Sequence, residues 1–130
     1  MRSDYKIKLF SLLVIFTIII SGLSIKNYLL TDSKKLNHKI DNIQIAIDKR
    51  QWSSAYSLSN KLNQDWEKSE PIWAIFINHH EIDNITISLK KAIKYIKCKD
   101  PIDSAVHLSE LKEYIDHIPA METLSFKNIF

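Results

Sequence analysis

The feature that most constrains this chain is an uncharged run near its N-terminus, Leu9 to Ile25, which reads LFSLLVIFTIIISGLSI. Its polar side chains are hydroxyls, which can bond the backbone of their own helix, so none forbids burial in lipid. At ~1.5 Å per residue the run reaches roughly 25 Å, slightly less than the ~30 Å hydrocarbon core of a bilayer. Flanking tyrosines and lysines can extend the span. The run predicts a transmembrane helix over 9–27, behind a basic tail over 1–8.

A cleaved signal peptide is the alternative for the same segment. A basic start, an apolar core and the small residues Gly22 and Ser24 make a passable cleavage region, but the alanine-type cleavage pattern is imperfect, which favours a retained anchor. Lysines and arginines lie on both sides of the run, so the positive-inside rule does not fix its orientation. Long domains translocate largely regardless of charge. We therefore expect a single-pass protein of the cell membrane whose C-terminal domain, residues 28–130, is extracytoplasmic.

The composition of the remaining chain favours helices joined by short links. The 130 residues contain one glycine and three prolines, which leaves few sites for left-handed turns. The glycine lies inside the apolar run, so the chain has no glycine-rich phosphate loop. Much of the formal charge of +3 belongs to the basic start, and the chain from Lys26 onward is close to neutral. We therefore expect no nucleic-acid partner.

Apolar residues after the run recur at steps of three and four, which is a helical period. The pattern predicts helices at about 28–49, 52–67, 71–98 and 101–118. Pro71 is placed in the first turn of the third helix behind Ser69 as its cap, and Asp100 caps the fourth helix before Pro101. Pro119 is expected to end that helix and to leave an extended tail over 119–130. The first helix can continue directly from the transmembrane helix.

These elements predict an all-α fold: an N-terminal transmembrane helix followed by a four-helix bundle of two αα-hairpins with a short C-terminal tail. A single hairpin could not bury its apolar stripe alone. The segments Ser54–Ser59 (SAYSLS) and Ser104–Ser109 (SAVHLS) agree at four of six positions, 50 residues apart. Each would open the second helix of a hairpin, where small side chains allow close approach. Chance similarity in a biased composition explains the match about as well.

The densest polar cluster is the sequence HHEID over residues 79–83. On a helix His79 and Asp83 face the same way, as a two-ligand metal half-site requires, and His107 could complete it from the fourth helix. The helical H-E-x-x-H arrangement is absent. The simpler interpretation makes His79 a core histidine bonded to a neighbouring helix, with His80 and Glu81 in solvent. We predict no catalytic residue, no bound metal and no cofactor, and keep His79, Asp83 and His107 as weak metal candidates.

Three tryptophans lie around the second helix and its link to the third, at Trp52, Trp66 and Trp73. Aromatic residues so spaced usually lock a helix–helix corner in the core. Alternatively, some of them anchor a partner, since tryptophan is over-represented among binding hot spots. The residues predicted to serve interaction or packing are Trp52, Trp66, Trp73, His80, Glu81 and Phe130.

Together, the basic start, the apolar segment, the Trp66…Trp73 pair, the HHEID cluster and the terminal Glu122…Leu124…Asn128-Ile129-Phe130 resemble a known family. This is a family of single-pass proteins of clostridia and bacilli known as a domain of unknown function, family forty-three sixty-three. The resemblance covers nearly the whole chain. It implies a small membrane-anchored protein of a spore-forming Firmicute that accompanies a multi-pass membrane protein. It assigns no functional residue.

The sequence therefore favours a non-enzymatic, membrane-anchored helical domain that binds another membrane protein, with the bilayer contacted through Leu9 to Ile25. The alternative is a sensor domain that binds a small ligand or a metal near His79, Asp83 and His107. A metal-dependent hydrolase using the same residues is least favoured, because no activated water, base and oxyanion donors can be named. A homodimer through an exposed apolar stripe is a further alternative.

Overall fold

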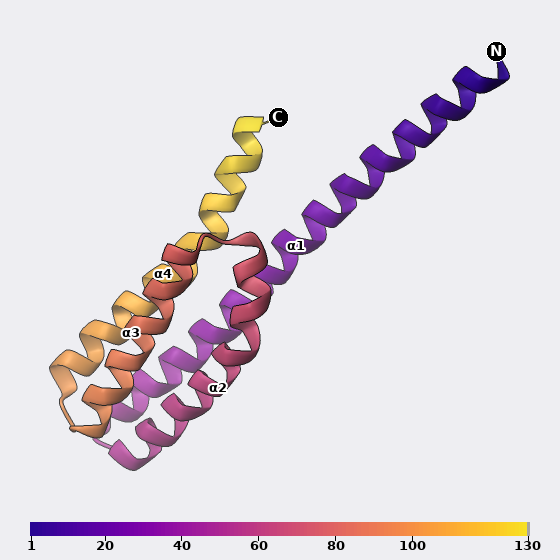
Figure 1. The fold of residues 1–130 in the computed structure, drawn as a ribbon. Helices are drawn as coiled ribbons and strands as arrows, with labels where there is room; N and C mark the ends of the chain where they lie inside the picture. The colour runs from indigo at the N-terminus through magenta and orange to yellow at the C-terminus, as the bar shows by residue number, and fades with distance from the viewer. Residues whose placement is uncertain (130) are drawn as a thin grey trace.

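The computed structural model describes the backbone of residues 1–129 and the side chains of residues 1–118. It contains four helices: α1 (Arg2–Asp48), α2 (Trp52–Phe76), α3 (His79–Lys97) and α4 (Pro101–Ile129) (Figure 1). Residues 1–129 include no strand, which confirms the predicted all-α class. Phe130, one of the predicted interaction residues, lies outside the described part of the chain.

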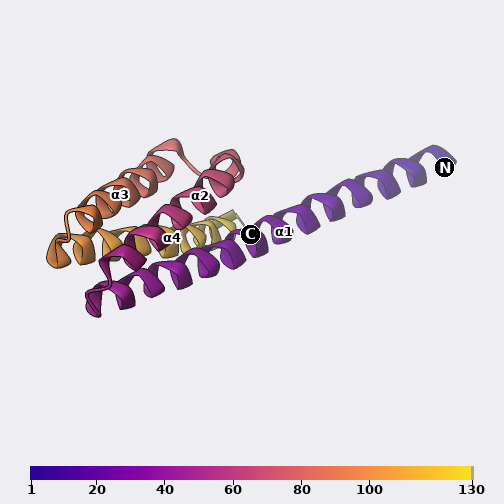
Figure 2. The ribbon, with the colours of Figure 1, turned by 90° about the horizontal axis from the view of Figure 1, so that it is seen from below.

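The four helices form a bundle in which each helix packs against two others. α1 packs on α2 and α4, and α3 packs on the same two helices. The α1–α2 and α3–α4 turns lie together at one end, here called the distal end, and the α2–α3 link lies at the opposite, proximal end (Figures 1 and 2). The N-terminal half of α1 projects from the proximal end. This arrangement confirms the prediction of a long apolar N-terminal helix joined to a bundle of two αα-hairpins.

The projecting half of α1 is apolar and makes almost no contact with the bundle. Every side chain from Met1 to Ser21 is exposed, and the first buried residue of the helix is Leu29. The hydroxyls of Thr17 and Ser21 donate to the carbonyl oxygens of Leu13 and Thr17, each at 2.8 Å. Within the described residues, α1 is the helix long and apolar enough to cross a membrane by length and composition. The same helix then runs unbroken into the bundle.

Both hairpin turns end their first helix with the same left-handed backbone. Arg50 has a φ of 59° and Lys99 a φ of 57°. In the first turn the N–H of Gln51 donates to Ala46 at 2.9 Å; in the second, the N–H of Asp100 donates to Tyr95 at 3.0 Å. The N–H of Arg50 also donates to Ile47, and the N–H of Lys99 to Ile96, so each turn has both bonds of a Schellman motif. The turns are equivalent at a spacing of 49 residues.

Burial along the helices repeats at the same spacing. In α2 the buried positions include Ala55, Ser59, Leu62, Trp66 and Ser69, and in α4 they are Ser104, Leu108, Leu111, Ile115 and Ile118. In α1 they include Ser33, Leu36, Ile40, Ile43 and Ile47, which correspond to Ile82, Ile85, Leu89, Ala92 and Ile96 in α3. Each of these pairs is 49 residues apart. The bundle therefore consists of two structurally repeated hairpins.

The short sequence similarity pointed to the repeat in the wrong register. It aligns Ala55 with Ala105 at a spacing of 50, but Ala55 is buried while Ala105 is only half-buried. The structural equivalent of Ala55 is Ser104, and both are 0% exposed. The two turns have the same length, and the helices that follow them begin at Trp52 and Pro101, which are 49 residues apart. Both of these positions hold small, fully buried residues, and the close helix approach that the sequence suggested there stays a prediction.

The predicted boundary between the second and third helices was wrong. Pro71 lies inside α2, which continues to Phe76. The link between α2 and α3 consists of Ile77 and Asn78. Ile77 is extended, with φ −114° and ψ 143°, and the Asn78 side chain accepts the N–H of His80 at 2.9 Å, as an N-cap does. Pro71 is exposed, while Trp73 is buried just beyond it. Packing of Trp73 into the core requires the helix to continue past the proline.

The predicted end of the fourth helix was also wrong. α4 begins as expected, since the Asp100 carboxylate accepts the N–H groups of Ile102 and Asp103, each at 3.0 Å. It then continues through Pro119 to Ile129, so the predicted extended tail over 119–130 is helical over 119–129. A proline removes one backbone hydrogen bond, but the following Ala120, Met121 and Glu122 are strong helix formers.

Candidate functional site

Two of the three tryptophans form a contact in the core, at the proximal half of the bundle. The rings of Trp66 and Trp73 meet edge to face, with centroids 5.5 Å apart and an interplanar angle of 79°. The Trp66 indole N–H donates to Thr86 Oγ1 at 3.0 Å, and the Trp73 indole N–H donates to Asp32 Oδ2 at 2.7 Å. The pair therefore links α2 to both α3 and α1.

The tryptophans serve packing. Trp66 is 2% exposed and Trp73 is 0% exposed, so neither can anchor a partner without leaving the core. Trp52 is half-buried as the first residue of α2, at the distal end, and does not join the pair. The predicted aromatic corner is therefore made by two residues instead of three.

The histidine cluster lies at the start of α3 and outside the core. His79 is the first residue of the helix and is exposed, as is His80, while Glu81 is half-buried. The interpretation of His79 as a core histidine was therefore wrong. It assumed a helix that began at Pro71 and ran through residue 79, whereas the buried stripe of α3 begins at Ile82.

The weak metal candidates do not come together. His107 stacks on Tyr95, with ring centroids 5.2 Å apart and planes 10° from parallel. Tyr95 lies sixteen residues beyond His79 on α3, a distance of about 24 Å along the helix axis. His79 and Asp83 are thus at the proximal end of α3, and His107 is near its distal end. Among the described side chains, no group of three or more histidine, cysteine or acidic residues could hold a metal ion.

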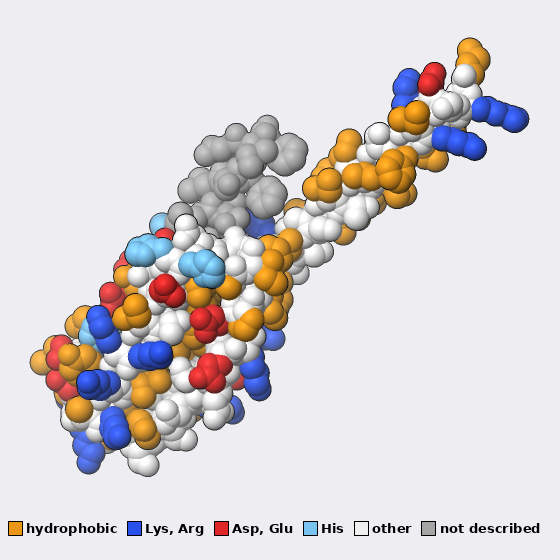
Figure 3. All heavy atoms as spheres, in the orientation of Figure 1, with side chains coloured by type: hydrophobic (Ala, Val, Ile, Leu, Met, Phe, Trp, Pro, Cys, Tyr) orange, Lys and Arg blue, Asp and Glu red, His pale blue; other side chains and the backbone are white. Residues whose placement is uncertain are grey.

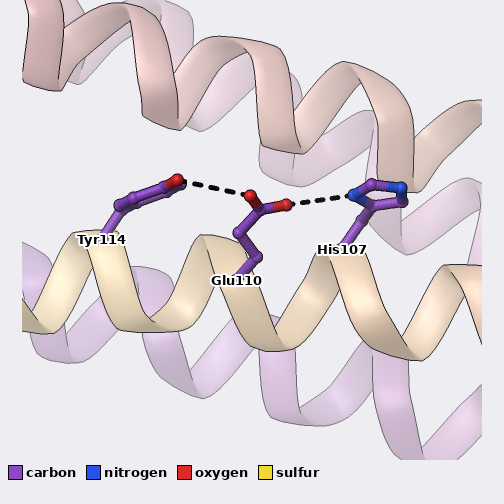
Figure 4. Close-up of polar contacts among 3 residues, drawn as sticks. All are labelled: His107, Glu110 and Tyr114. Carbon is purple, nitrogen blue, oxygen red and sulfur yellow. Dashed lines mark hydrogen bonds and ion pairs between the residues drawn. The ribbon is translucent and has the colours of Figure 1, made fainter.

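A polar network that sequence reasoning missed runs along one face of α4 (Figure 4). His107 Nδ1 lies 3.1 Å from Glu110 Oε2, and the Tyr114 hydroxyl donates to Glu110 Oε1 at 3.3 Å. Burial raises the pKa of the Tyr114 phenol, and the carboxylate of Glu110 raises this pKa further. The signal in the sequence was the spacing of three and four residues, which places the side chains on one helix face. These contacts hold the three side chains along one face of α4.

Polar contacts also fasten α1 to both of its neighbours. Lys39 pairs with Asp65 of α2, and Asn37 donates to Asp116 of α4. The Ser33 hydroxyl donates to the carbonyl oxygen of Ile115 at 3.1 Å, within the core. α1 is therefore held along its C-terminal half by buried and half-buried bonds to α2 and α4.

The projecting half of α1 exposes a continuous series of large apolar side chains. Figure 3 shows hydrophobic side chains distributed around this part of the helix, between a basic tip and the bundle. Its exposed large residues include Leu9, Phe10, Leu12, Leu13, Ile15, Phe16, Ile18, Ile19, Ile20 and Leu23. Exposed apolar surface of this extent marks a membrane or protein interaction surface.

Over residues 1–129 the chain is an all-α protein, in which a bundle of two repeated helical hairpins is continuous with an exposed apolar helix that could cross a membrane. The family model "Domain of unknown function (DUF4363)" matches residues 23–129, which include the whole bundle. The chain therefore belongs to this family, and the resemblance drawn from its sequence is confirmed. Its clostridial or bacillar origin stays a prediction. Comparisons with curated proteins and with solved structures gave no match.

Proposed function

We propose that this protein is a membrane-anchored, non-enzymatic helical domain that acts as an accessory subunit of another membrane protein. The observation that carries the proposal is the continuity of α1, which runs as one helix from Arg2 to Asp48. Its first half offers the surface that fits a bilayer, and its second half is a core element of the bundle. The proposed anchor and one core helix of the bundle are thus two parts of the same helix, α1.

This continuity would couple the bundle mechanically to the membrane. A helix of 47 residues extends roughly 70 Å, and here its C-terminal half is fixed by bonds to α2 and α4. A flexible linker would let the domain move independently of its anchor. A continuous helix instead fixes the orientation of the bundle relative to the anchor, and so relative to any protein that contacts the anchor within the bilayer.

The sensor alternative has less support. It required His79, Asp83 and His107 to surround one ligand. His79 and Asp83, however, lie at the proximal end of α3, whereas His107 of α4 stacks on Tyr95 near the distal end of α3. The polar network around Glu110 lies along one face of α4 and includes neither His79 nor Asp83. We therefore place the interaction surface on the projecting half of α1 and on the exposed faces of the bundle, with the bundle on the extracytoplasmic side.

Membrane insertion can be tested by alkaline extraction of cell membranes. The full chain is expected to stay in the membrane pellet, and Phe16→Lys, in the middle of the apolar segment, is expected to release part of it. The matched control is Ile45→Lys, an exposed apolar position of the same helix within the bundle, 51% exposed. Release of the unaltered chain, or equal behaviour of the two variants, would refute insertion through Leu9 to Ile25.

The accessory role can be tested by crosslinking in native membranes followed by purification of the full chain. A specific membrane protein is expected to co-purify. The control is a chain in which residues 9–25 are replaced by an unrelated apolar segment of equal length, so that anchoring is kept and specific helix contacts are lost. If no membrane protein is captured by either chain, the accessory role is wrong even when the anchor is real.

A further inference from the structure

We propose that the α2–α3 corner is a second membrane contact, in which Ile72, Ile75 and Phe76 enter the lipid headgroup region beside α1. The proposal rests on the membrane insertion of α1 proposed above. It adds a direct contact between the proximal end of the bundle and the bilayer surface, besides the insertion of α1.

The first observation is an exposed apolar face at the end of α2. Ile72 is 41% exposed, Ile75 is 73% exposed and Phe76 is 39% exposed. Their spacing of three and four residues places them on one side of the helix. The last turn of α2 carries no basic residue, and the buried face of the same turn is already occupied by Trp73. The exposed apolar residues are thus not needed to fill the core, because Trp73 fills it at this turn.

The second observation is the position of this apolar face relative to the residues of α1, measured along the axis of that helix. The two helices run antiparallel, and Lys39 of α1 pairs with Asp65 of α2. Eleven residues further along α2 lies Phe76, and eleven residues back along α1 lies Tyr28. The bond from Trp73 to Asp32 gives nearly the same register. The corner therefore lies level with the turn of α1 that follows the apolar segment.

This height matches the headgroup region of a bilayer. Tyr28 is three residues beyond Ile25, where the apolar segment ends, which is about 5 Å along the helix. The polar region of a bilayer extends roughly 5 to 8 Å on each side of the hydrocarbon core. If the segment spans, the end of α2 falls within this layer. Isoleucine and phenylalanine side chains in that layer bury apolar surface that would otherwise face water.

The two ends of the bundle differ in their exposed side chains. On the face shown in Figure 3, lysine and arginine side chains lie at the distal end and along one edge of the bundle, and most of the histidine side chains lie at the proximal end. The distal turns carry Lys49, Arg50, Lys97 and Lys99, all of them exposed. Four exposed cations thus lie at the end farther from the projecting half of α1, and the apolar corner lies at the nearer end, where Lys26, Lys34 and Lys35 of α1 also lie.

The test measures the surroundings of Ile75 in the full chain reconstituted into phospholipid vesicles. A nitroxide label is attached at Ile75→Cys after Cys98, which is exposed, has been changed to serine. The matched control is Ile102→Cys, at the distal start of α4, because Ile102 is 74% exposed and Ile75 is 73% exposed. We expect a higher ratio of oxygen to nickel-chelate collisions at Ile75 than at Ile102, which should be fully aqueous.

A third label, at Phe16→Cys, separates this proposal from the one on which it rests. A lipid-like signal at Phe16 with an aqueous signal at Ile75 would overturn the corner contact and leave the anchor intact. An aqueous signal at Phe16 would overturn the anchor itself. Loss of collisions with both reagents at Ile75 would mean a protein covers the corner, which also overturns the lipid contact.

A second variant tests the role of the apolar face. With the label at Ile75, Phe76→Asp should shift the label toward the aqueous signal, because a carboxylate resists transfer out of water. Ile87→Asp is the control, since Ile87 lies on an exposed face of α3 and is 50% exposed. Circular dichroism of both variants reports whether the bundle stays folded. An unchanged signal at Ile75 in a folded Phe76→Asp protein would refute the proposal.

Discussion

The indole nitrogen of Trp73 donates a hydrogen bond to the carboxylate of Asp32 at 2.7 Å. This bond joins the end of α2 to α1 seven residues after the apolar segment, where the projecting helix enters the bundle. Trp73 is completely buried, so its N–H has no access to water. The bond therefore fixes the rest of the bundle to α1 at the proximal end.

Removal of that acceptor should destabilise the bundle. Asp32→Ala leaves a buried indole N–H without a partner, which costs about 1–3 kcal/mol of unfolding free energy. Asp48→Ala, an exposed carboxylate at the end of the same helix, should change it by less than about 0.5 kcal/mol. Urea unfolding of the full chain in detergent, followed by circular dichroism, measures both. Equal effects of the two substitutions would contradict a structural role for the bond.

The two left-handed turn residues should respond to glycine in the same way. Arg50→Gly and Lys99→Gly relieve a backbone conformation that costs a residue with a Cβ atom roughly 1–2 kcal/mol. Each should therefore stabilise the bundle by up to about 1 kcal/mol after the greater chain entropy of glycine is counted. Lys49→Gly, whose φ is −84°, should not stabilise it. Opposite effects at the two turns would show that the hairpins are not equivalent.

Pro71 offers a direct test of where α2 ends. Inside a helix a proline is about 3 kcal/mol less favourable than alanine, whereas in the first turn it is well tolerated. Because Pro71 is exposed and interior to α2, Pro71→Ala should raise the melting temperature of the bundle. A lowered melting temperature would indicate instead that a helix begins at this residue.

Stability should fall at alkaline pH through two tyrosines. Burial raises the pKa of Tyr28, as does the nearby Asp32, and burial and Glu110 raise that of Tyr114. A phenol with a raised pKa in the folded state contributes its full stability below the unfolded pKa of about 10, and this is lost as pH rises through the folded value. Tyr28→Phe and Tyr114→Phe should each flatten the decline in unfolding free energy above pH ~10, relative to Tyr56→Phe. Spectrophotometric titration at the phenolate band identifies the late-titrating groups.

At the start of α4 the local helix signals in the sequence were interpreted correctly. Asp100 caps α4 before Pro101 as expected, because both residues favour the same boundary. At Pro71 and Pro119 the proline rule failed, since the helix continues on both sides of each residue. At Pro71 the reason is tertiary: Trp73 gains a buried position and an acceptor, Asp32, only if α2 continues past the proline.

The histidine cluster shows the same limit for a functional site. Spacing placed His79 and Asp83 on one face. The helix, however, begins eight residues later than predicted, at His79 instead of Pro71, so His79 is exposed at the helix start instead of buried in the core. The distance to His107 depends on how α3 and α4 pair, which spacing within one helix does not specify. The network of Glu110 with Tyr114, by contrast, lies within one helix, and its spacing was visible in the sequence.

The sequence by itself determined that the chain is helical and that its first segment is apolar enough to cross a membrane, because both follow from local period and local hydropathy. The tertiary structure decided where α2 ends and which tryptophans are buried. It also decided that the two hairpins repeat at 49 residues and that an apolar corner stands level with Tyr28. These features depend on which helix faces meet, and that is settled by the joint burial of residues far apart in the chain.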